Sequence, residues 1–427
     1  MKQIFKKIVI NTIEWQAHLI IKKFKPYIIA ITGSVGKTSA KEAVYFVVSS
    51  KYHTRKSQKS FNSEIGVPLT ILGCPTGWSN PFVWLRNIFK GFAVLLFTKN
   101  YPKYLVLEVG ADSPGDIKRI CSWLSPNTGI VTAIGETPVH IENFPSRNEL
   151  VAEKSELVKA VSSTGKVILN ADDESTVEMR SLFEGKPLFY GLSNEAEVSA
   201  SHYRHDYNEK QEITGFSFRV NYNGSSVPFT FNGFLGRQHV YAVLAGVSVG
   251  VSQGINMVAI QESLGRYQAE PGRVKIIEGK NNSVILDDSY NASPVSVDAV
   301  LDELNELDVK GRKIAVLGDM MELGRFSKEE HRKIGKKALN ICDYVFSVGV
   351  RGRIITEESD DKDKVKHYSN SFKIADDFPL ELKSGDVVLV KGSQAVRMEI
   401  VTKSLMKEPK RAKDLLVRQE SHWEKST

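Results

Sequence analysis

The residues with the clearest chemical meaning lie in the run ITGSVGKTS at positions 31–39. A buried strand is predicted to lead through a glycine turn into Gly36, Lys37 and Thr38, where a helix begins. Such glycines let backbone N–H groups approach phosphate oxygens, and the start of a helix favours negative charge. Lys37 can reach the β- and γ-phosphates of a nucleotide, and the Thr38 hydroxyl can hold Mg²⁺. The run therefore predicts a cradle for ATP and Mg²⁺.

The elements that position this loop alternate between short apolar runs and helical stretches. In a parallel α/β sheet, strands end in Gly, Asp or Asn at the edge where ligand loops gather. The runs that fit this description are residues 27–33, 104–111, 129–135, 166–173, 283–288, 313–319, 344–349 and 386–393. Residues 186–232 instead show short alternating segments with Asn-Gly at 223–224, which predicts an antiparallel hairpin extension.

We therefore predict an α/β fold with two main domains, since 427 residues suffice for each to bury its own core. A central P-loop ATPase domain with a parallel sheet is expected over residues 27–268. A Rossmann-like C-terminal domain is expected over residues 269–427, with a hinge near 265–272. A short amphipathic helix over residues 1–26 is expected to precede both.

Composition narrows the classes of partner. The formal net charge of +7 is a mild surplus, which suits anionic small molecules or a membrane surface as well as nucleic acid. The chain has no aromatic-plus-basic pattern of the RNA-binding kind, so we expect no nucleic-acid partner. Its three cysteines form no CxxC pair, which argues for a reducing compartment and against disulfides and a zinc site.

Two segments are both apolar and basic. The first segment is residues 1–25. On a helix, one narrow stripe of it would contain Lys7, Asn11, Glu14, His18 and Lys25. The second segment, residues 81–97, is short for a membrane span of about 20 residues and contains Arg86 and Lys90. We expect the first helix to dock against residues 81–97. The second hypothesis is a peripheral membrane contact through residues 1–25 and 81–97.

The order of motifs along the chain resembles the Mur ligase family, the amide-forming synthetases of peptidoglycan precursors. The motifs that carry the resemblance are TGSVGKT (32–38), FNSEIGVP (61–68), LEVGADSPGDI (107–117), TPVHIENF (137–144), AEKSEL (152–157), LNADD (169–173), PGR (271–273), DDSYNASP (287–294), LGDMMELG (317–324) and VKGS (390–393). DDSYNASP and GDMMELG with the following His331 favour the branch that adds D-alanyl-D-alanine to UDP-N-acetylmuramoyl-tripeptide. The resemblance implies an ATP-dependent ligase that forms an acyl phosphate and releases ADP.

The resemblance also implies roles for individual residues. The implied Mg²⁺ ligands are Thr38, Glu108, His140 and, once carbamylated by CO₂, Lys154. The implied nucleotide contacts are Gly33, Ser34, Gly36, Lys37, Thr38, Ser39, Asn170, Arg273, Asp288, Tyr290 and Asn291. The implied substrate contacts are Asn62, Glu64, Asn291, Lys391 and Ser393. The implied catalytic groups are Lys37, His140, Lys154 and Arg273.

Several of these residues also have structural interpretations. Lys154 lies between Glu153 and Glu156, which is typical of a solvated, salt-bridged helix face. A glutamate at a strand end, such as Glu108, is often a salt-bridge partner. The run Asp-Ser-Tyr-Asn at 288–291 is also favourable turn chemistry.

The sequence departs from the family in two places. Only about 27 residues precede the phosphate loop and its strand, so we expect the usual UDP-binding domain to be missing. In the run GRQHVYAVLAG at 236–246, Gln238, His239 and Ala242 replace the pattern in which the family places asparagines near the adenine. The sequence therefore leaves open which residues of this helix contact the adenine. Gln238 and His239 are the candidates to replace the missing asparagines.

Three functions follow as hypotheses. The leading one is addition of D-alanyl-D-alanine to a muramoyl tripeptide, with both as small-molecule partners. The second is a Mur-type ligase with a different, lipid-linked acceptor. The third is a non-catalytic NTP-binding partner at the membrane. We expect a cytoplasmic location. If the membrane hypothesis holds, the protein is expected at the inner face of the bilayer.

Overall fold

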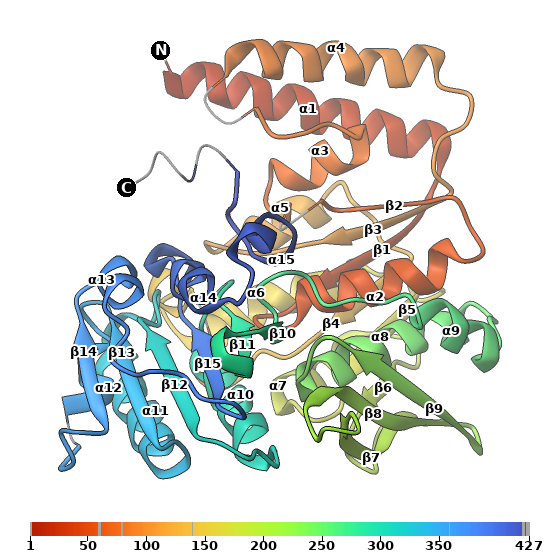
Figure 1. The fold of residues 1–427 in the computed structure, drawn as a ribbon. Helices are drawn as coiled ribbons and strands as arrows, with labels where there is room; N and C mark the ends of the chain where they lie inside the picture. Colours follow the sequence, from red (N-terminus) through yellow and green to blue (C-terminus); the bar gives the residue numbers. More distant parts are fainter. Residues whose placement is uncertain are drawn as a thin grey trace.

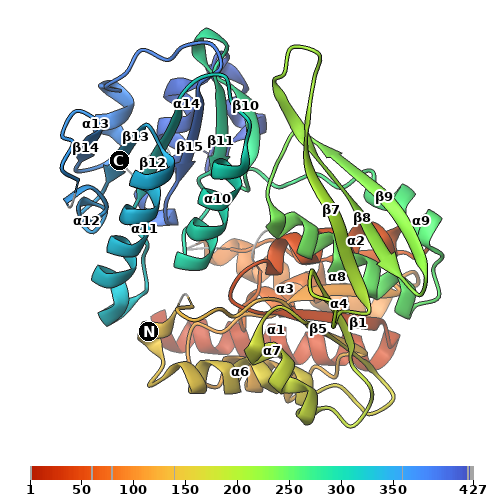
Figure 2. The same ribbon diagram turned by 90° about the horizontal axis from the view of Figure 1, so that it is seen from below.

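Two sheets covered by helices make up the molecule (Figures 1 and 2). The computed structural model describes residues 2–58, 61–77, 80–138, 140–357, 359–420 and 423, with the backbone alone for residues 2–7. Each sheet has helices on both faces, and its interior strands, such as β1, β4, β12 and β15, are buried on both sides, as in other parallel α/β folds. The α/β fold predicted from the sequence is confirmed.

The first sheet, counted over the described residues, has nine strands in the order β2-β3-β1-β4-β5-β6-β7-β8-β9. Its strands pair in parallel as far as β7, and β8 and β9 then add an antiparallel extension. The strands are β1 (Tyr27–Thr32), β2 (Thr54–Lys56), β3 (Tyr104–Glu108), β4 (Thr128–Val131), β5 (Lys166–Asn170), β6 (Leu188–Gly191), β7 (Val198–Tyr207), β8 (Ile213–Tyr222) and β9 (Ser225–Asn232).

Helices cover both faces of this sheet. Ile29 and Ile31 of β1 pack with the helices on one face, whereas Ile28 and Ala30 pack with those on the other, as the alternation of a strand requires. The helices of the first face are α2 (Lys37–Ser49), α8 (Arg237–Ser252) and α9 (Met257–Leu264). Those of the second face and the layer outside it are α1 (Lys2–Phe24), α3 (Gly66–Leu72), α4 (Pro81–Phe97), α5 (Asp116–Cys121), α6 (Arg147–Lys159) and α7 (Glu174–Glu178).

The second sheet has six described strands in the order β10-β11-β15-β12-β13-β14, of which only β10 is antiparallel to its neighbour. The strands are β10 (Lys275–Glu278), β11 (Val284–Asp288), β12 (Lys313–Gly318), β13 (Tyr344–Val348), β14 (Val365–Tyr368) and β15 (Val387–Lys391). The helices are α10 (Pro294–Glu306), α11 (Ser327–Ile341), α12 (Arg353–Glu357), α13 (Ser371–Asp376), α14 (Glu399–Leu405) and α15 (Ala412–Leu415).

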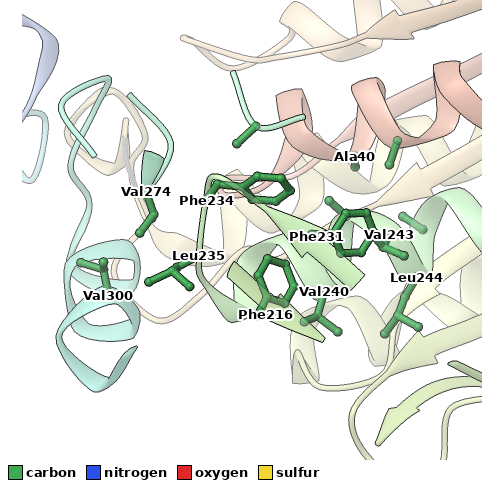
Figure 3. Packing of buried hydrophobic residues seen from close by; sticks show 14 of the residues in the cluster. Ala40, Phe216, Phe231, Phe234, Leu235, Val240, Val243, Leu244, Val274 and Val300 are labelled. Carbon is green, nitrogen blue, oxygen red and sulfur yellow. The ribbon is translucent and has the colours of Figure 1, made fainter. Parts of the chain in front are cut away.

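One hydrophobic cluster joins the two sheets. Phe216 and Phe231 of the antiparallel extension pack beside Phe234, and the cluster continues through Val274 to Val300 of α10 (Figure 3). Because buried side chains of both sheets share this cluster, the two parts of the chain stabilise each other. The domain boundaries at 26 and 268 stay a prediction.

The two apolar segments near the N-terminus pack against each other, which confirms the favoured docking prediction (Figure 1). A Cβ on Gly91 of α4 would lie 2.2 Å from Oε1 of Gln16, so the helices approach closely at this glycine. The Gln16 amide also donates to the carbonyl of Ile88 at 2.9 Å. On its inner side, α1 buries Ile13 and Ile20 against the central domain.

Three short strands, β2, β10 and β14, were not predicted from the sequence. They contain three or four residues each and are partly exposed along much of their length, so they lack the apolar runs that mark the interior strands. In the described part of the chain, no helix is both long and apolar enough to cross a membrane.

Candidate active site

The phosphate loop connects β1 to α2 through residues 33–36. A Cβ on Gly33 would lie 1.9 Å from Oγ1 of Thr132, and Gly36 has φ +86°, a conformation that favours glycine. Both glycines are therefore required by the path of the loop. The predicted strand–loop–helix arrangement at this position is confirmed.

Two ammonium groups converge on one carbonyl oxygen of this loop. The Nζ of Lys37 donates to the carbonyl of Gly33 at 2.9 Å, and the Nζ of Lys154, from α6, donates to the same oxygen at 3.1 Å. Burial lowers the pKa of both lysines, that of Lys154 to about 7, and the neighbouring Lys37 contributes to the shift at Lys154. Two cations held together in a buried site favour an anion, and they suit the phosphates of a nucleotide.

The interpretation of Lys154 as part of a solvated helix face is wrong, because this side chain is only 3% exposed. Its neighbour Glu153 turns away and accepts hydrogen bonds from three backbone N–H groups around the start of α5. Glu156 pairs instead with Lys159 on the outer side of the helix, at 2.8 Å. The glutamates that flank the lysine in the sequence therefore form separate contacts in the fold.

Glu108 lies at the carboxyl end of β3, beside the start of α2. Its carboxylate accepts hydrogen bonds from the Thr38 hydroxyl at 3.1 Å and from the Asn62 amide at 3.2 Å. The backbone N–H of Glu108 donates to the hydroxyl of Ser57 at 3.1 Å. Thr38, Glu108 and Asn62, which were predicted separately as metal and substrate contacts, thus form one hydrogen-bonded chain.

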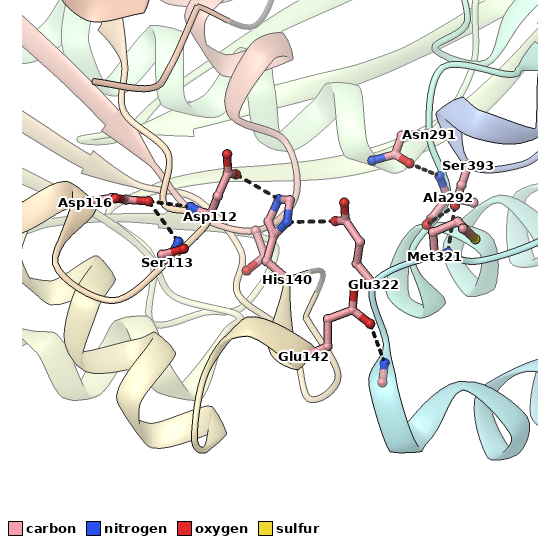
Figure 4. A network of polar contacts seen from close by, with 12 residues as sticks. Asp112, Ser113, Asp116, His140, Glu142, Asn291, Ala292, Met321, Glu322 and Ser393 are labelled. Carbon is pink, nitrogen blue, oxygen red and sulfur yellow. Dashed lines mark hydrogen bonds and ion pairs between the residues drawn. The ribbon is translucent and has the colours of Figure 1, made fainter. Parts of the chain in front are cut away.

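His140 lies where the two halves of the molecule meet (Figure 4). Its Nδ1 is 2.7 Å from a carboxylate oxygen of Glu322, in the C-terminal half, and its Nε2 is 3.7 Å from Asp112. Within the described residues, no three His, Cys, Asp or Glu side chains converge as a metal site. The predicted metal ligands thus lie as two groups, Thr38 with Glu108 and His140 with its acidic neighbours.

The predicted substrate residues of the C-terminal half lie at the ends of β11 and β15. Lys391 and Asp288 form a buried ion pair at 2.5 Å, and Lys391 also donates to the carbonyl of Asn291 at 3.0 Å. The Ser393 hydroxyl accepts from the backbone N–H of Met321 at 2.9 Å. Asp288 and Lys391 were assigned to different ligands, and the structure brings them together as one neutralised pair.

Arg273 enters the same region from the turn before β10. A Cβ on Gly272 would lie 2.8 Å from the backbone nitrogen of Tyr290, which shows how closely this turn approaches β11. The guanidinium of Arg273 lies 4.2 Å from the centroid of the Tyr290 ring. The positive charge of Arg273 contributes to the lowered pKa values of both Lys37, in the central half, and Lys391, in the C-terminal half.

Three other predicted contacts lie around this centre. Ser39 forms a side-chain hydrogen bond with Tyr267. Asn170 ends β5 and accepts through its side chain from the backbone N–H of Asp172 at 3.0 Å. Glu64 pairs with Arg119 at 2.5 Å, so its carboxylate is already engaged.

His239, considered above as a substitute adenine contact, lies fully buried among aromatic rings. Its Nε2 donates to the carbonyl of Arg273 at 3.0 Å, and its Nδ1 lies 2.8 Å from the Tyr267 hydroxyl. Burial lowers the pKa of His239 to about 4, so the ring is neutral. Since both ring nitrogens are engaged and the side chain has no exposed surface, His239 holds the backbone of Arg273 and is closed to a ligand.

The residues present fit ATP. Ser34 Oγ and Arg273 Nε are buried, and neither has a hydrogen-bond partner among the described residues. A buried polar atom without a partner is costly, and phosphate oxygens near the loop would satisfy both. Hydroxyl and carboxylate oxygens, such as those of Thr38 and Glu108, are also the donors that Mg²⁺ prefers.

Sequence reasoning missed three residues of this region, namely Asp112, Glu322 and Arg418. Asp112 and Glu322 lie inside motifs that were quoted above, but their contacts with His140 join separate parts of the chain. Arg418 lies in the charged tail and donates to the carbonyls of Ser289 and Tyr290. The sequence near Arg418 contains no motif that could have identified it.

Two segments of the chain match sequence models of domains from one protein family. Residues 90–250 match the Mur ligase middle domain, and residues 272–394 match the Mur ligase, glutamate ligase domain. Together they cover more than half of the chain. They also contain most of the groups described above, including Lys154, His140 and Lys391.

Individual relatives match the chain over a greater part of its length than the two domain models do. The chain is 26% identical to the UDP-N-acetylmuramoyl-tripeptide–D-alanyl-D-alanine ligase of Bacillus subtilis (strain 168), over 94% of this chain and 80% of that protein. It is 28% identical to the ligase of that name from Escherichia coli (strain K12), over 88% of this chain and 76% of that protein.

A solved structure extends the agreement to the fold. The MurF ligase from Thermotoga maritima, in complex with ADP, superposes with a TM-score of 0.78 at 26% identity, over 94% of this chain and 84% of that chain. MurF from Acinetobacter baumannii, at 23% identity and a TM-score of 0.75, shares the fold. Because both matched segments, the relatives and the arrangement of the two sheets agree, the chain belongs to the Mur ligase family.

Proposed function

We propose that the protein is an ATP-dependent ligase that joins D-alanyl-D-alanine to UDP-N-acetylmuramoyl-tripeptide, with release of ADP and phosphate. The observation that carries this proposal is the pair of buried lysines, Lys37 and Lys154, on the carbonyl of Gly33 in the phosphate loop. The names of the relatives supply the two substrates. The reaction builds an amide and belongs to the synthesis of peptidoglycan precursors.

The reaction proceeds in two displacements. A carboxylate oxygen of the acceptor attacks the γ-phosphorus of ATP, the bond to the bridging oxygen breaks, and ADP leaves. The amine of the dipeptide then attacks the acyl carbon and loses a proton, and phosphate leaves. Lys37, which bonds to the phosphate loop, and Arg273, whose buried Nε has no hydrogen-bond partner among the described residues, would neutralise the charge on the transferring phosphoryl group.

Thr38 and Glu108 would hold one Mg²⁺, and His140 and Lys154 would contribute to a second. The metal supplies charge neutralisation at the phosphate oxygens. Lys154 would hold the metal as a carbamate, an anion in which its nitrogen is bonded to the carbon of CO₂ and has lost a proton. The pKa of about 7 supports this step, because about half of the amine is then neutral at neutral pH.

The test is a stoichiometric assay with the purified full-length chain, ATP, Mg²⁺, UDP-N-acetylmuramoyl-tripeptide and D-alanyl-D-alanine. One ADP and one phosphate should form for each new amide, and omission of either substrate should stop product formation. AMP as the stoichiometric product would exclude the acyl-phosphate route. Nucleotide binding without turnover of any acceptor would instead favour a non-catalytic NTP-binding protein.

The second candidate is the same chemistry on a lipid-linked acceptor. A specific observation favours it, namely the exposed apolar side of α4, where Phe82 and Phe97 are both more than three-quarters exposed. The assay above distinguishes the two candidates when the muramoyl tripeptide is supplied either as the UDP derivative or on a polyprenyl lipid in vesicles. Turnover of the lipid-linked form alone would replace the leading proposal.

A further inference from the structure

The outer side of α4 exposes an unusual amount of apolar surface. We define the α4 face by its large exposed side chains, which are Phe82, Leu85, Phe89, Phe92, Leu96 and Phe97. They recur at the three- and four-residue spacing that places side chains on one side of a helix. Apolar groups this numerous on one side of a surface helix mark an interaction site.

The packing of α4 on α1 does not account for the α4 face. The inner side of α4 contains the buried Asn87 and Gly91, and Gln16 of α1 packs there. Trp15 of α1 is itself half exposed and lies edge-on to Phe92, with ring centroids 6.2 Å apart. The exposed apolar surface therefore continues from α4 onto α1. These two helices lie side by side at one edge of the molecule (Figure 1).

The charge of the surrounding sequence has one sign. Between Glu64 and Glu108 there is no acidic residue, whereas Arg86, Lys90, Lys99 and Lys103 are basic. Residues 1–26 add six lysines and a single glutamate, so these two segments carry more positive charge than the chain's net +7, and the rest of the chain is slightly acidic. The side chains of Arg86 and Lys99 are exposed, and they extend from the apolar helix as a basic rim.

A groove between α1 and α4 combines both properties. Its walls are mostly apolar, formed by Trp15, Leu19, Phe92, Leu95 and Leu96, and Lys22 and Lys23 complete its lining. Apolar walls suit acyl chains, and lysines near them suit a phosphate headgroup. The groove thus combines apolar and basic side chains, as the α4 face and its surroundings do.

We propose that the α4 face, with the groove beside it, docks on a bilayer that contains anionic lipids, with α4 lying in the plane of the interface. Apolar side chains enter the boundary between headgroups and acyl chains, and the basic rim faces the lipid phosphates. A second copy of this chain fits less well, because a two-fold contact would bring two basic rims together. The proposal concerns location and does not depend on which acceptor the ligase uses.

Charged side chains connect the layer formed by α1 and α4 to the active site. Glu14 of α1 pairs with Arg119 of α5 at 2.7 Å, and Arg119 also pairs with Glu64. Glu64 lies two residues from Asn62, which bonds to Glu108 in the active site. Docking would therefore place the loop at 61–65 on the membrane side of the active site.

Flotation of the full-length protein on density gradients tests the proposal, with neutral phosphatidylcholine vesicles and with vesicles that also contain phosphatidylglycerol. We expect flotation with the anionic vesicles and at least about tenfold weaker binding when salt rises from about 0.05 to about 0.5 M. The variant Phe82→Ser, Phe89→Ser, Leu96→Ser should lose at least about tenfold in vesicle affinity.

A matched variant replaces three apolar side chains that are exposed elsewhere, Val258→Ser, Val350→Ser and Phe372→Ser, and should float like the wild type. Unchanged thermal stabilisation by ADP shows that each variant is folded. The proposal is overturned if the wild type stays at the bottom of both gradients, or if the α4-face variant floats normally. It is equally overturned if that variant abolishes only a concentration-dependent dimer in sedimentation, because a second copy is then the partner.

Discussion

At the scale of single residues, the site is organised around one carbonyl oxygen that accepts from two lysines. The bond from Lys37 to Gly33 spans four residues and belongs to the loop itself, whereas the bond from Lys154 spans 121 residues. We therefore expect ATP binding to depend on Lys37 and the loop. We assign Lys154 to the later steps, which require a second metal.

We predict that Lys154→Ala abolishes ligation and leaves ATP affinity nearly unchanged. The loop and helix α2 remain intact without this side chain, because Lys37 still holds the carbonyl of Gly33. Small carboxylates in the buffer should partly restore turnover, because they replace the carbamate. Product formation and nucleotide titration measure the two effects separately.

Lys159→Ala provides the matched control. This lysine lies on the same helix, is exposed, and pairs with Glu156 one turn away, a kind of contact worth about 0.5 kcal/mol or less. Its removal should leave turnover unchanged. Full activity of Lys154→Ala without added carboxylate would show that the buried amine has no part in the chemistry.

The buried imidazole of His239 predicts a pH dependence of stability. Its pKa is about 4 in the folded protein and about 6.5 in an unfolded chain. Below pH 6.5 the unfolded state binds a proton that the folded state does not, so stability falls as the pH falls towards 4. The linkage relation gives a loss of about 2 kcal/mol by pH 5.

Urea unfolding of the wild type and of His239→Gln at pH 7.5, 6 and 5 measures this loss. Glutamine cannot titrate in this range, so the variant should be less stable at pH 7.5 and should lose about 2 kcal/mol less than the wild type on acidification. His202→Gln, on the exposed side of β7, is the control and should titrate like the wild type. Parallel pH curves for the wild type and His239→Gln would contradict a neutral buried ring.

At the scale of elements, the short helix α5 depends on a side chain from α6. Its N-cap is Gly115, which has no side chain to accept the free N–H groups of the first turn. Glu153 accepts instead, from Gly115, Ile117 and Lys118 at 2.6 to 3.2 Å. A carboxylate at this end of a helix is also favoured by the helix dipole.

We predict that Glu153→Ala lowers the free energy of unfolding by about 2 kcal/mol, because one buried and two part-buried N–H groups lose a charged acceptor. Glu156→Ala, three residues along α6, removes an exposed contact and should cost at most about 0.5 kcal/mol. Denaturant unfolding of both variants makes the comparison. Equal losses would show that the cap on α5 contributes nothing specific.

The sequence determines local elements more clearly than the contacts between them. The phosphate loop, the interior strands and helix 81–97 were predictable because their signals lie within a few adjacent residues. The pairing of Lys391 with Asp288 joins residues 103 apart, and the sequence shows only two separate polar strand ends. The burial of Lys154 was likewise hidden, because its helix shows alternating charges whether or not one face is covered.

At the scale of the whole molecule, the two halves meet through a buried polar contact as well as a shared hydrophobic cluster. Glu303 of α10 accepts from the Tyr203 hydroxyl and lies 2.8 Å from His205 Nε2, both on β7. Its side chain is 1% exposed. Nearby, Glu306 pairs with Arg237 at 2.6 Å, but both of those side chains are more than 40% exposed.

These contacts join α10 of the C-terminal half to β7 and α8 of the central half. The turn that joins the halves contains Gly272 at φ +72° and Val274 at φ +51°, and a β-branched residue rarely adopts the second conformation. Such a turn is costly to maintain without support from its surroundings. We infer that the contact of Glu303 with β7 is part of that support.

We therefore predict that Glu303→Gln loosens the closed arrangement, because two buried donors lose a charged acceptor at a cost of about 1–3 kcal/mol. We expect the nucleotide to contact both halves, so the apparent ATP affinity should fall by up to about tenfold as the fraction of molecules with the halves in contact decreases. Small-angle scattering should show a larger radius of gyration without nucleotide and recovery at saturating ADP. Glu306→Gln, one turn away and exposed, should change neither quantity by more than a small amount. If Glu306→Gln expands the molecule as much as Glu303→Gln does, closure depends on the overall charge between the halves, and the buried contact has no special role.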